Sequence, residues 1–147
     1  MRDHVRFRSA AFIAAQGEDR MTNPGRYGHD LASWVVARLR AADITVGEPI
    51  AEDWGWVVEV RQSDRSFSIA CGNVDGEDDQ WLLWMEPEKT GFVRRLIGKP
   101  NDGPGGDARS DLLRRIDQWL REEASVSDIE WFRSDARLQE IDHGPHP

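Results

Sequence analysis

Hydrophobic and polar residues alternate at period two between residues 54 and 60, and this is the most informative pattern in the chain. One phase of the alternation contains Trp54, Trp56, Val58 and Val60. Successive side chains of a β-strand point to opposite faces, so the pattern predicts a strand over residues 54–62 with these four residues on its buried face. A glycine between the two indoles, Gly55, indicates that a bulky group such as a helix or another Trp approaches the opposite face.

Further strands are predicted by similar short patterns over residues 4–13, 44–50, 66–72, 80–85 and 129–133. The segments 54–62 and 66–72 form a hairpin across residues 63–65. Residues 80–85 are apolar in both phases, which is typical of a central strand covered on both faces.

Two helices are predicted from apolar residues at helical spacing, over residues 30–42 and 107–123. Asp30 stands at the start of the first helix, where its carboxylate can cap the first turn. Residues 87–106 carry the weakest pattern, with a short helix or strand near residues 92–97 and a glycine- and proline-rich loop over residues 99–106.

The resulting order is strand, helix, about four strands, helix and strand. Strands that follow one another with short connections favour antiparallel pairing with helices packed against the sheet. The sequence therefore predicts an α+β fold, with a mainly antiparallel sheet of about five to six strands and two main helices. It also predicts a single domain over residues 1–141 and a flexible C-terminal tail over residues 142–147.

Composition supports one folded domain in a reducing compartment. The chain has 147 residues, of which 39% are hydrophobic, and it contains a single cysteine, Cys71. Cys71 shares its phase with Phe67 and Ile69, which predicts a buried, inert thiol. No apolar stretch approaches the roughly 20 residues of a membrane span, so we expect a cytoplasmic protein.

Negative charge is concentrated in the middle of the chain. Residues 41–90 carry twelve acidic and three basic residues, out of a net charge of −8 for the whole chain. Such a segment repels nucleic-acid phosphates and attracts basic proteins. The candidate binding residues are Glu52, Asp53, Glu77, Asp78 and Asp79. The alternative is that these acids only form a solvated face that favours solubility.

Enzymatic motifs are largely missing. The order of elements is that of metal-dependent restriction-type nucleases, whose chemistry needs an acidic residue two positions before a lysine. The chain has instead Glu59 two positions before Arg61, and arginine cannot act as a base. The turn at residues 75–79 has the charge of a calcium loop without its ligand spacing, and we predict no metal site and no cofactor. An enzyme that uses Glu52, Asp53 and Glu59 for metal or acid–base chemistry is the alternative function.

Three segments together resemble a group of small, uncharacterised, single-domain bacterial proteins. They read Gly-Glu-Asp-Arg at residues 17–20, Asn-Pro-Gly-Arg-Tyr-Gly-His-Asp-Leu-Ala-Ser-Trp at residues 23–34, and Glu-Asp-Trp-Gly-Trp at residues 52–56. The resemblance implies no catalytic residue and no substrate. In size, acidity and lack of a catalytic motif, the chain is also similar to immunity proteins that neutralise bacterial toxins. The sequence thus favours a non-enzymatic module that binds a basic protein, and it leaves the oligomeric state open.

Overall fold

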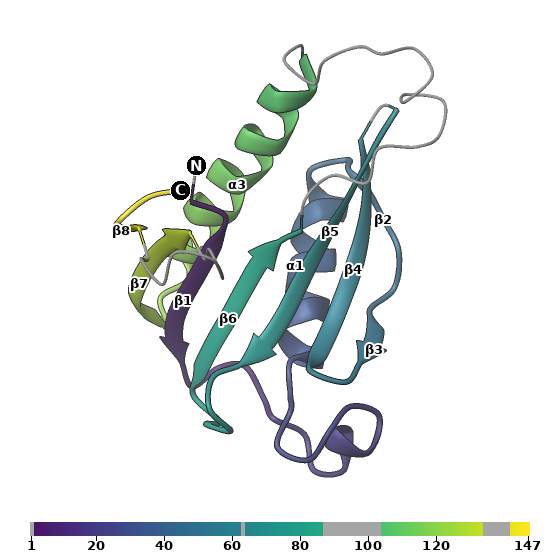
Figure 1. Cartoon of the computed structure of the whole chain (residues 1–147), viewed down its shortest axis with the longest axis vertical. Helices are drawn as coiled ribbons and strands as arrows, with labels where there is room; N and C mark the ends of the chain where they lie inside the picture. The colour runs from purple at the N-terminus through teal and green to yellow at the C-terminus, as the bar shows by residue number, and fades with distance from the viewer. Residues whose placement is uncertain (1, 63, 87–103, 134–141) are drawn as a thin grey trace.

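The structure, a computed structural model, describes residues 2–62, 64–86, 104–133 and 142–147. These residues form two α-helices and a twisted sheet, with a short 3₁₀-helix in the loop below the sheet in the view of Figure 1. The elements in chain order are β1 (His4–Ser9), η1 (Glu18–Arg20), α1 (His29–Ala41), β2 (Thr45–Val46), β3 (Ile50–Glu52), β4 (Gly55–Gln62), β5 (Arg65–Asn73), β6 (Gln80–Met85), α3 (Pro104–Glu122), β7 (Val126–Arg133) and β8 (Asp142–Gly144).

All the strands belong to one sheet with the order β2-β4-β5-β6-β1-β7-β8, and β3 pairs with β4 beside β2. Every pairing in the described residues is antiparallel. The predicted α+β class is therefore confirmed. The sheet has eight strands rather than five or six, because residues 44–50 divide into β2 and β3 and because β8 extends the other edge.

Both helices pack on one face of the sheet, which we call the helix face. One line of directly paired residues crosses this face from β7 to β4, and all its members are buried: Trp131, Val5, Leu83, Cys71 and Trp56. They share a hydrophobic core with Leu31 and Val35 of α1 and with Leu112 and Ile116 of α3. Burial of apolar side chains against this line holds both helices to the sheet.

The predicted position of Trp54 is wrong, because the regular alternation of side chains stops at Gly55. Gly55 has a φ of 156°, and a Cβ atom at this position would lie 2.5 Å from the carbonyl oxygen of Cys71. Only glycine allows this approach between neighbouring strands. What lies close to Gly55 is therefore the backbone of β5, not a bulky side chain. Trp56 points into the core, whereas Trp54 lies in the turn before β4 and contacts Trp84, which has the opposite phase to buried Leu83.

Strand β6 has the predicted bounds but is not fully covered on both sides. Trp81, Leu83 and Met85 are buried on the helix face, whereas Leu82 and Trp84 in the other phase remain partly exposed. Both helices lie on the helix face, so no helix in the described residues covers Leu82 and Trp84. The other face of the sheet is therefore partly open, and we call it the outer face.

Helix bounds differ from the expected ones mainly at α3, which begins at Pro104 rather than at residue 107. Proline suits the first turn of a helix because the missing N–H has no partner there in any case. The short element expected near residues 92–97 lies outside the described residues. In the described part of the chain, no helix is long and apolar enough to cross a membrane.

Residues 142–147, where the sequence predicts a flexible tail, contact the sheet edge and α3 in the structure. Asp142–Gly144 forms β8, with His143 opposite Phe132 of β7. Beyond β8, His146 Nδ1 lies 3.1 Å from the buried carboxylate of Asp117 in α3. The same carboxylate accepts a hydrogen bond of 2.8 Å from the indole of Trp131. These contacts attach the end of the chain to the sheet edge and to α3.

The different surroundings of the tryptophans lead to different expected effects on stability. Trp56→Ala and Trp81→Ala should each lower the free energy of unfolding by about 3–5 kcal/mol, because both indoles are buried in the core. Trp54→Ala should cost clearly less, since its indole is partly exposed. Chemical denaturation checks this order, and an equal loss for all three variants would contradict the placement of Trp54.

Candidate functional site

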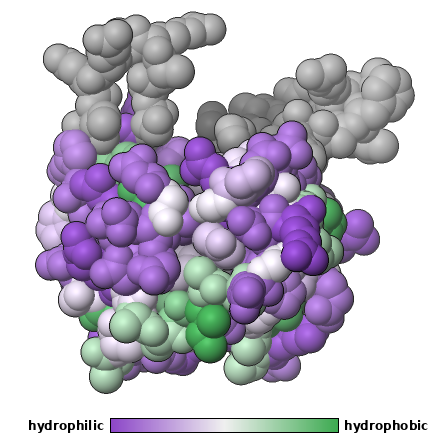
Figure 2. Space-filling model, turned by 90° about the horizontal axis from the view of Figure 1, so that it is seen from below, coloured by the Kyte–Doolittle hydropathy of each residue, from purple (hydrophilic) through white to green (hydrophobic). Residues whose placement is uncertain are grey.

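The predicted acidic residues gather at one end of the sheet. The turn between β3 and β4, the turn between β5 and β6, the end of β1 and the loop before α1 all lie at the lower end in Figure 1. Backbone hydrogen bonds join these segments, from Asn23 N to Asp53 O and from Ser9 N to Asp79 O. We call this region the acidic end. Figure 2 looks onto it and shows a largely hydrophilic surface, with a smaller hydrophobic area along its lower margin.

Four of the five predicted binding residues at the acidic end are exposed: Glu52, Asp53, Glu77 and Asp78. Among the described residues, none of these four carboxylates takes part in an ion pair. The fifth, Asp79, is partly exposed and pairs with Arg8 at 3.2 Å. Glu52 and Asp53 thus lie at the turn between β3 and β4, and residues 77–79 lie at the neighbouring turn between β5 and β6.

The carboxylates of Glu77, Asp78 and Asp79 lie within 4.8 Å of one another. All three come from a single turn and face solvent, and a closed calcium site would need six to eight oxygen ligands. The arrangement has the character of the solvated acidic turn that the sequence indicates.

Glu59, the third residue of the enzyme alternative, does not join the acidic end. It lies on β4 four residues beyond Gly55, which is the partner of Glu52, and this places it about 13 Å along the strand. Its carboxylate accepts a hydrogen bond of 2.9 Å from the hydroxyl of Ser68. Glu52, Asp53 and Glu59 therefore form no common site for a metal ion or a proton transfer.

Cys71 lies in the core line between Leu83 and Trp56 and is completely buried. Burial raises the pKa of its thiol far above the ordinary value, so the reactive thiolate is suppressed. His29 is exposed, and its ring lies edge-on to Trp56 at 4.6 Å. The burial of Cys71 agrees with the predicted inert thiol.

Glu18 is a structural residue that the sequence did not reveal. One oxygen of its carboxylate, Oε2, accepts hydrogen bonds from the backbone N–H groups of Gly28 and His29 at 2.8 and 3.1 Å. The same oxygen accepts a bond of 2.9 Å from the indole of Trp56. Glu18 thus caps α1, where a negative charge also interacts favourably with the helix dipole, and it ties the helix to β4. The carboxylate of Asp30, the predicted cap, instead accepts a hydrogen bond from the backbone N–H of Ile13.

A second feature that the sequence analysis missed is a line of aromatic residues on the outer face. Direct cross-strand pairs join Trp84 of β6 to His4 of β1, His4 to Phe132 of β7, and Phe132 to His143 of β8. The His4 ring stacks on Trp84 at 5.9 Å and lies 5.3 Å from the Phe132 ring. Trp54 contacts Trp84 at the other end of the line, with 4.8 Å between ring centroids. We call these five residues the aromatic row.

Small residues on β5 make room for the contact between Trp54 and Trp84. Strands β4 and β6 are separated by β5, so their axes are about 10 Å apart. Ala70 and Gly72 occupy the outer face of β5 between them, and Ala70 is paired directly with Trp84. The two indoles can therefore meet above β5.

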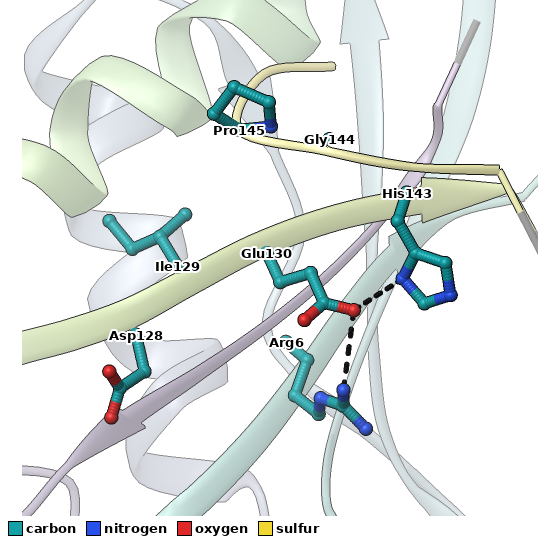
Figure 3. A pocket seen from close by; sticks show the side chains of 7 residues that line it. All are labelled: Arg6, Asp128, Ile129, Glu130, His143, Gly144 and Pro145. Atoms are coloured by element: carbon teal, nitrogen blue, oxygen red, sulfur yellow. Dashed lines mark hydrogen bonds and ion pairs between the residues drawn. The ribbon is translucent and has the colours of Figure 1, made fainter.

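The aromatic row ends in a shallow hollow of about 720 Å³ beside β7 and β8. Figure 3 shows the Glu130 carboxylate between the Arg6 guanidinium and the His143 imidazole, with Asp128 further along β7. Glu130 Oε1 is 3.3 Å from Arg6 and also bonds to His143. Asp128 lies 3.6 Å from the guanidinium of Arg8, so both carboxylates of the hollow are paired with arginines of β1.

Asp3 supports the aromatic row from the first residues of the chain. Its carboxylate lies 2.8 Å from His4 Nδ1 and 3.1 Å from the guanidinium of Arg109 in α3. Burial alone would raise the pKa of Asp3, but the hydrogen bonds from His4 and Arg109 outweigh this effect and hold the pKa below its ordinary value. Asp3 therefore connects the row to α3 in its charged form.

Comparisons of the chain with models of protein families, with curated protein sequences and with solved structures found no match.

Removal of the Glu18 carboxylate tests its structural role. Glu18→Ala should lower the free energy of unfolding by about 2–3 kcal/mol, because two backbone N–H groups and one indole N–H lose a charged acceptor. Glu52→Ala, at an exposed carboxylate, should stay within about 0.5 kcal/mol of wild type. Equal losses in urea denaturation for the two variants would contradict this role.

The lowered pKa of Asp3 predicts a pH-dependent effect on stability. The charged carboxylate contributes stability above the unfolded pKa of about 3.9, and the contribution is lost as pH falls through the lower folded value. Asp3→Asn should therefore be less stable than wild type at pH 7, and this difference should shrink as pH falls from about 5 to about 3. Thermal unfolding over this pH range measures it, and a difference independent of pH would contradict it.

Proposed function

We propose that this protein is a non-enzymatic binding module for a basic protein, and that its acidic end steers the partner. The observation that carries the proposal is the exposure of Glu52, Asp53, Glu77 and Asp78 on neighbouring turns at one end of the sheet. Unpaired surface carboxylates of one sign raise the rate at which an oppositely charged partner arrives. A role as an inhibitor, of the type of the immunity proteins, fits such a surface.

The alternative enzyme has less geometric support. Its three acids do not converge, and Glu52 and Asp53 are exposed and lie outside the hollows beside β7 and β8, between β2 and β4, and beside α1. Catalytic carboxylates typically lie in a concave site whose surroundings adjust their pKa. The proposal includes a cytoplasmic location, because the single buried thiol suits a reducing compartment.

The test begins with recovery of the partner by affinity capture with the wild-type chain as bait. Binding kinetics with this partner should then show an association rate that falls roughly tenfold or more between about 0.01 M and 0.15 M salt. The double variants Glu52→Lys/Asp53→Lys and Glu77→Lys/Asp78→Lys should associate more slowly than wild type at low salt, with folding intact.

A control with the same change of charge reverses two acids on α3, outside the acidic end, which pair with Arg115 and Arg38. The variant Asp111→Lys/Glu122→Lys changes the net charge by the same amount and should retain most of the wild-type rate. A rate that is independent of salt, or an equal effect of all three double variants, would contradict steering by the acidic end. The acids would then be the solvated face that the sequence also allows.

A further inference from the structure

We propose that a hollow beside the start of α1 is the anchor site for an arginine side chain of the basic partner. This inference rests on the proposed function and identifies the position that holds the partner after the acidic end has attracted it. The hollow has a volume of about 350 Å³, and the residues that line it include Ala11, Phe12, Asp30, Ser33, Trp34 and Glu123. We call it the α1 hollow.

The walls of the α1 hollow come from three segments that contact one another. Asp30, Ser33 and Trp34 are spaced i, i+3 and i+4 along α1, so they share one side of the helix. The Phe12 ring meets the Trp34 ring edge-on at 5.7 Å, and the Trp34 indole donates a hydrogen bond of 2.9 Å to Glu123. Because these contacts already hold the walls in place, binding would order few additional side chains.

An unpaired negative charge lies in the α1 hollow. Asp30 Oδ2 accepts a hydrogen bond of 2.9 Å from the backbone N–H of Ile13, and within the described residues Asp30 takes part in no ion pair. No basic residue is among those that line the hollow in the described part of the chain. The charge of Asp30 is therefore available to a cation that enters the hollow.

The second carboxylate, Glu123, is paired, but its partner is shared. Glu123 Oε1 accepts hydrogen bonds from Trp34 and Arg38, which hold the pKa of Glu123 below its ordinary value and keep it charged. The Arg38 guanidinium also lies 3.6 Å from Glu122. One guanidinium thus serves two carboxylates, and with Asp30 beside them the region retains a net negative charge.

An arginine side chain fits both the charge and the walls of the hollow. Its aliphatic stem can pack on the Phe12 and Trp34 rings, while its planar guanidinium carries five N–H donors that can serve Asp30 and Glu123 together. The face of the Trp34 ring is already covered by Arg38, whose Cζ atom lies 5.5 Å from the ring centroid. The incoming charge would therefore bind to the carboxylates and not to the ring face.

An exposed apolar residue stands beside the α1 hollow. Ile13 is 63% exposed, although it follows the buried Phe12 and its N–H binds Asp30. An apolar contact next to a charged anchor is typical of protein interfaces. The end of β1 and the start of α1 both lie at the acidic end, so a partner that is attracted there meets this hollow (Figure 1).

A peptide titration tests the site directly. The probe is a short peptide with one arginine beside a leucine in a glycine–serine background, and the control peptide carries the uncharged analogue citrulline in place of arginine. The readout is the NMR signal of the Trp34 indole N–H in the isotope-labelled full-length protein, assigned by its absence from Trp34→Phe. The arginine peptide should shift this signal and bind about tenfold more tightly than the citrulline peptide. The indole signal of Trp131, which binds Asp117 instead, should stay in place.

Two variants with the same change of charge locate the anchor. Asp30→Asn keeps an oxygen that can accept the bond from Ile13, and it should weaken binding of the arginine peptide by about tenfold. Asp43→Asn is the control, because Asp43 is exposed just beyond the other end of α1 and its φ of 60° is one that asparagine tolerates. This variant should bind like wild type. Chemical denaturation verifies that both variants are folded.

Three results of the titration would overturn the anchor site. They are equal affinity for the arginine and citrulline peptides, equal affinity of Asp30→Asn and Asp43→Asn for the arginine peptide, and no shift of the Trp34 signal at about 10 mM peptide. A lysine peptide that binds as tightly as the arginine peptide would overturn the assignment of the site to arginine.

Kinetics with the captured partner separate this inference from the proposed function. Asp30→Asn should speed dissociation about tenfold, whereas reversal of the acids at the acidic end should slow association. If Asp30→Asn leaves dissociation unchanged while those reversals still slow association, the anchor site is wrong and the proposed function stands. A salt-independent association rate contradicts the proposed function whatever the peptides show.

Discussion

The structure depends on the close approach of two glycines to the backbone of β5 at Cys71. A Cβ atom on Gly55 would lie 2.5 Å from the Cys71 carbonyl oxygen, and one on Gly28 would lie 2.6 Å from it. Gly28 precedes α1 and Gly55 opens β4, so this contact sets where the helix meets the sheet. Glu18 connects the same two elements, because its carboxylate accepts hydrogen bonds from the start of α1 and from the indole of Trp56 in β4. The side chains that the helix buries follow from this placement.

The same constraint also creates the outer surface. Because the alternation stops at Gly55, the two indoles of the Trp-Gly-Trp segment lie on different faces of the sheet. Trp56 joins the core line, and Trp54 begins the aromatic row beside the exposed Asp53. A short segment thus contributes to the core, to the acidic end and to the outer face. Residues 17–20, 23–34 and 52–56 contain Glu18, Gly28 and Gly55, so each of these three segments contributes a residue to this contact region.

Local patterns predicted most of the elements, and the errors occur where a distant contact decides. Strand β6 was predicted at its observed bounds, because an apolar run between polar turns depends little on its neighbours. Trp54 was misplaced because a period-two pattern contains no information on the positive φ of Gly55. The role of Glu18 was missed because its partners lie 10, 11 and 38 residues away in the sequence.

Of the two surface features, the sequence predicts the acidic end but not the aromatic row. The acidic residues could be predicted because charge is a property of composition, and a segment this acidic must expose most of its carboxylates. The aromatic row could not, because it depends on pairing between β6, β1, β7 and β8, which are separated by as many as 140 residues. One signal was present: His4, Trp84 and Phe132 each occupy the outward phase of a strand, where polar residues are usual. Only the pairing of β6, β1 and β7 in the folded sheet joins these three separate residues into one line across the outer face.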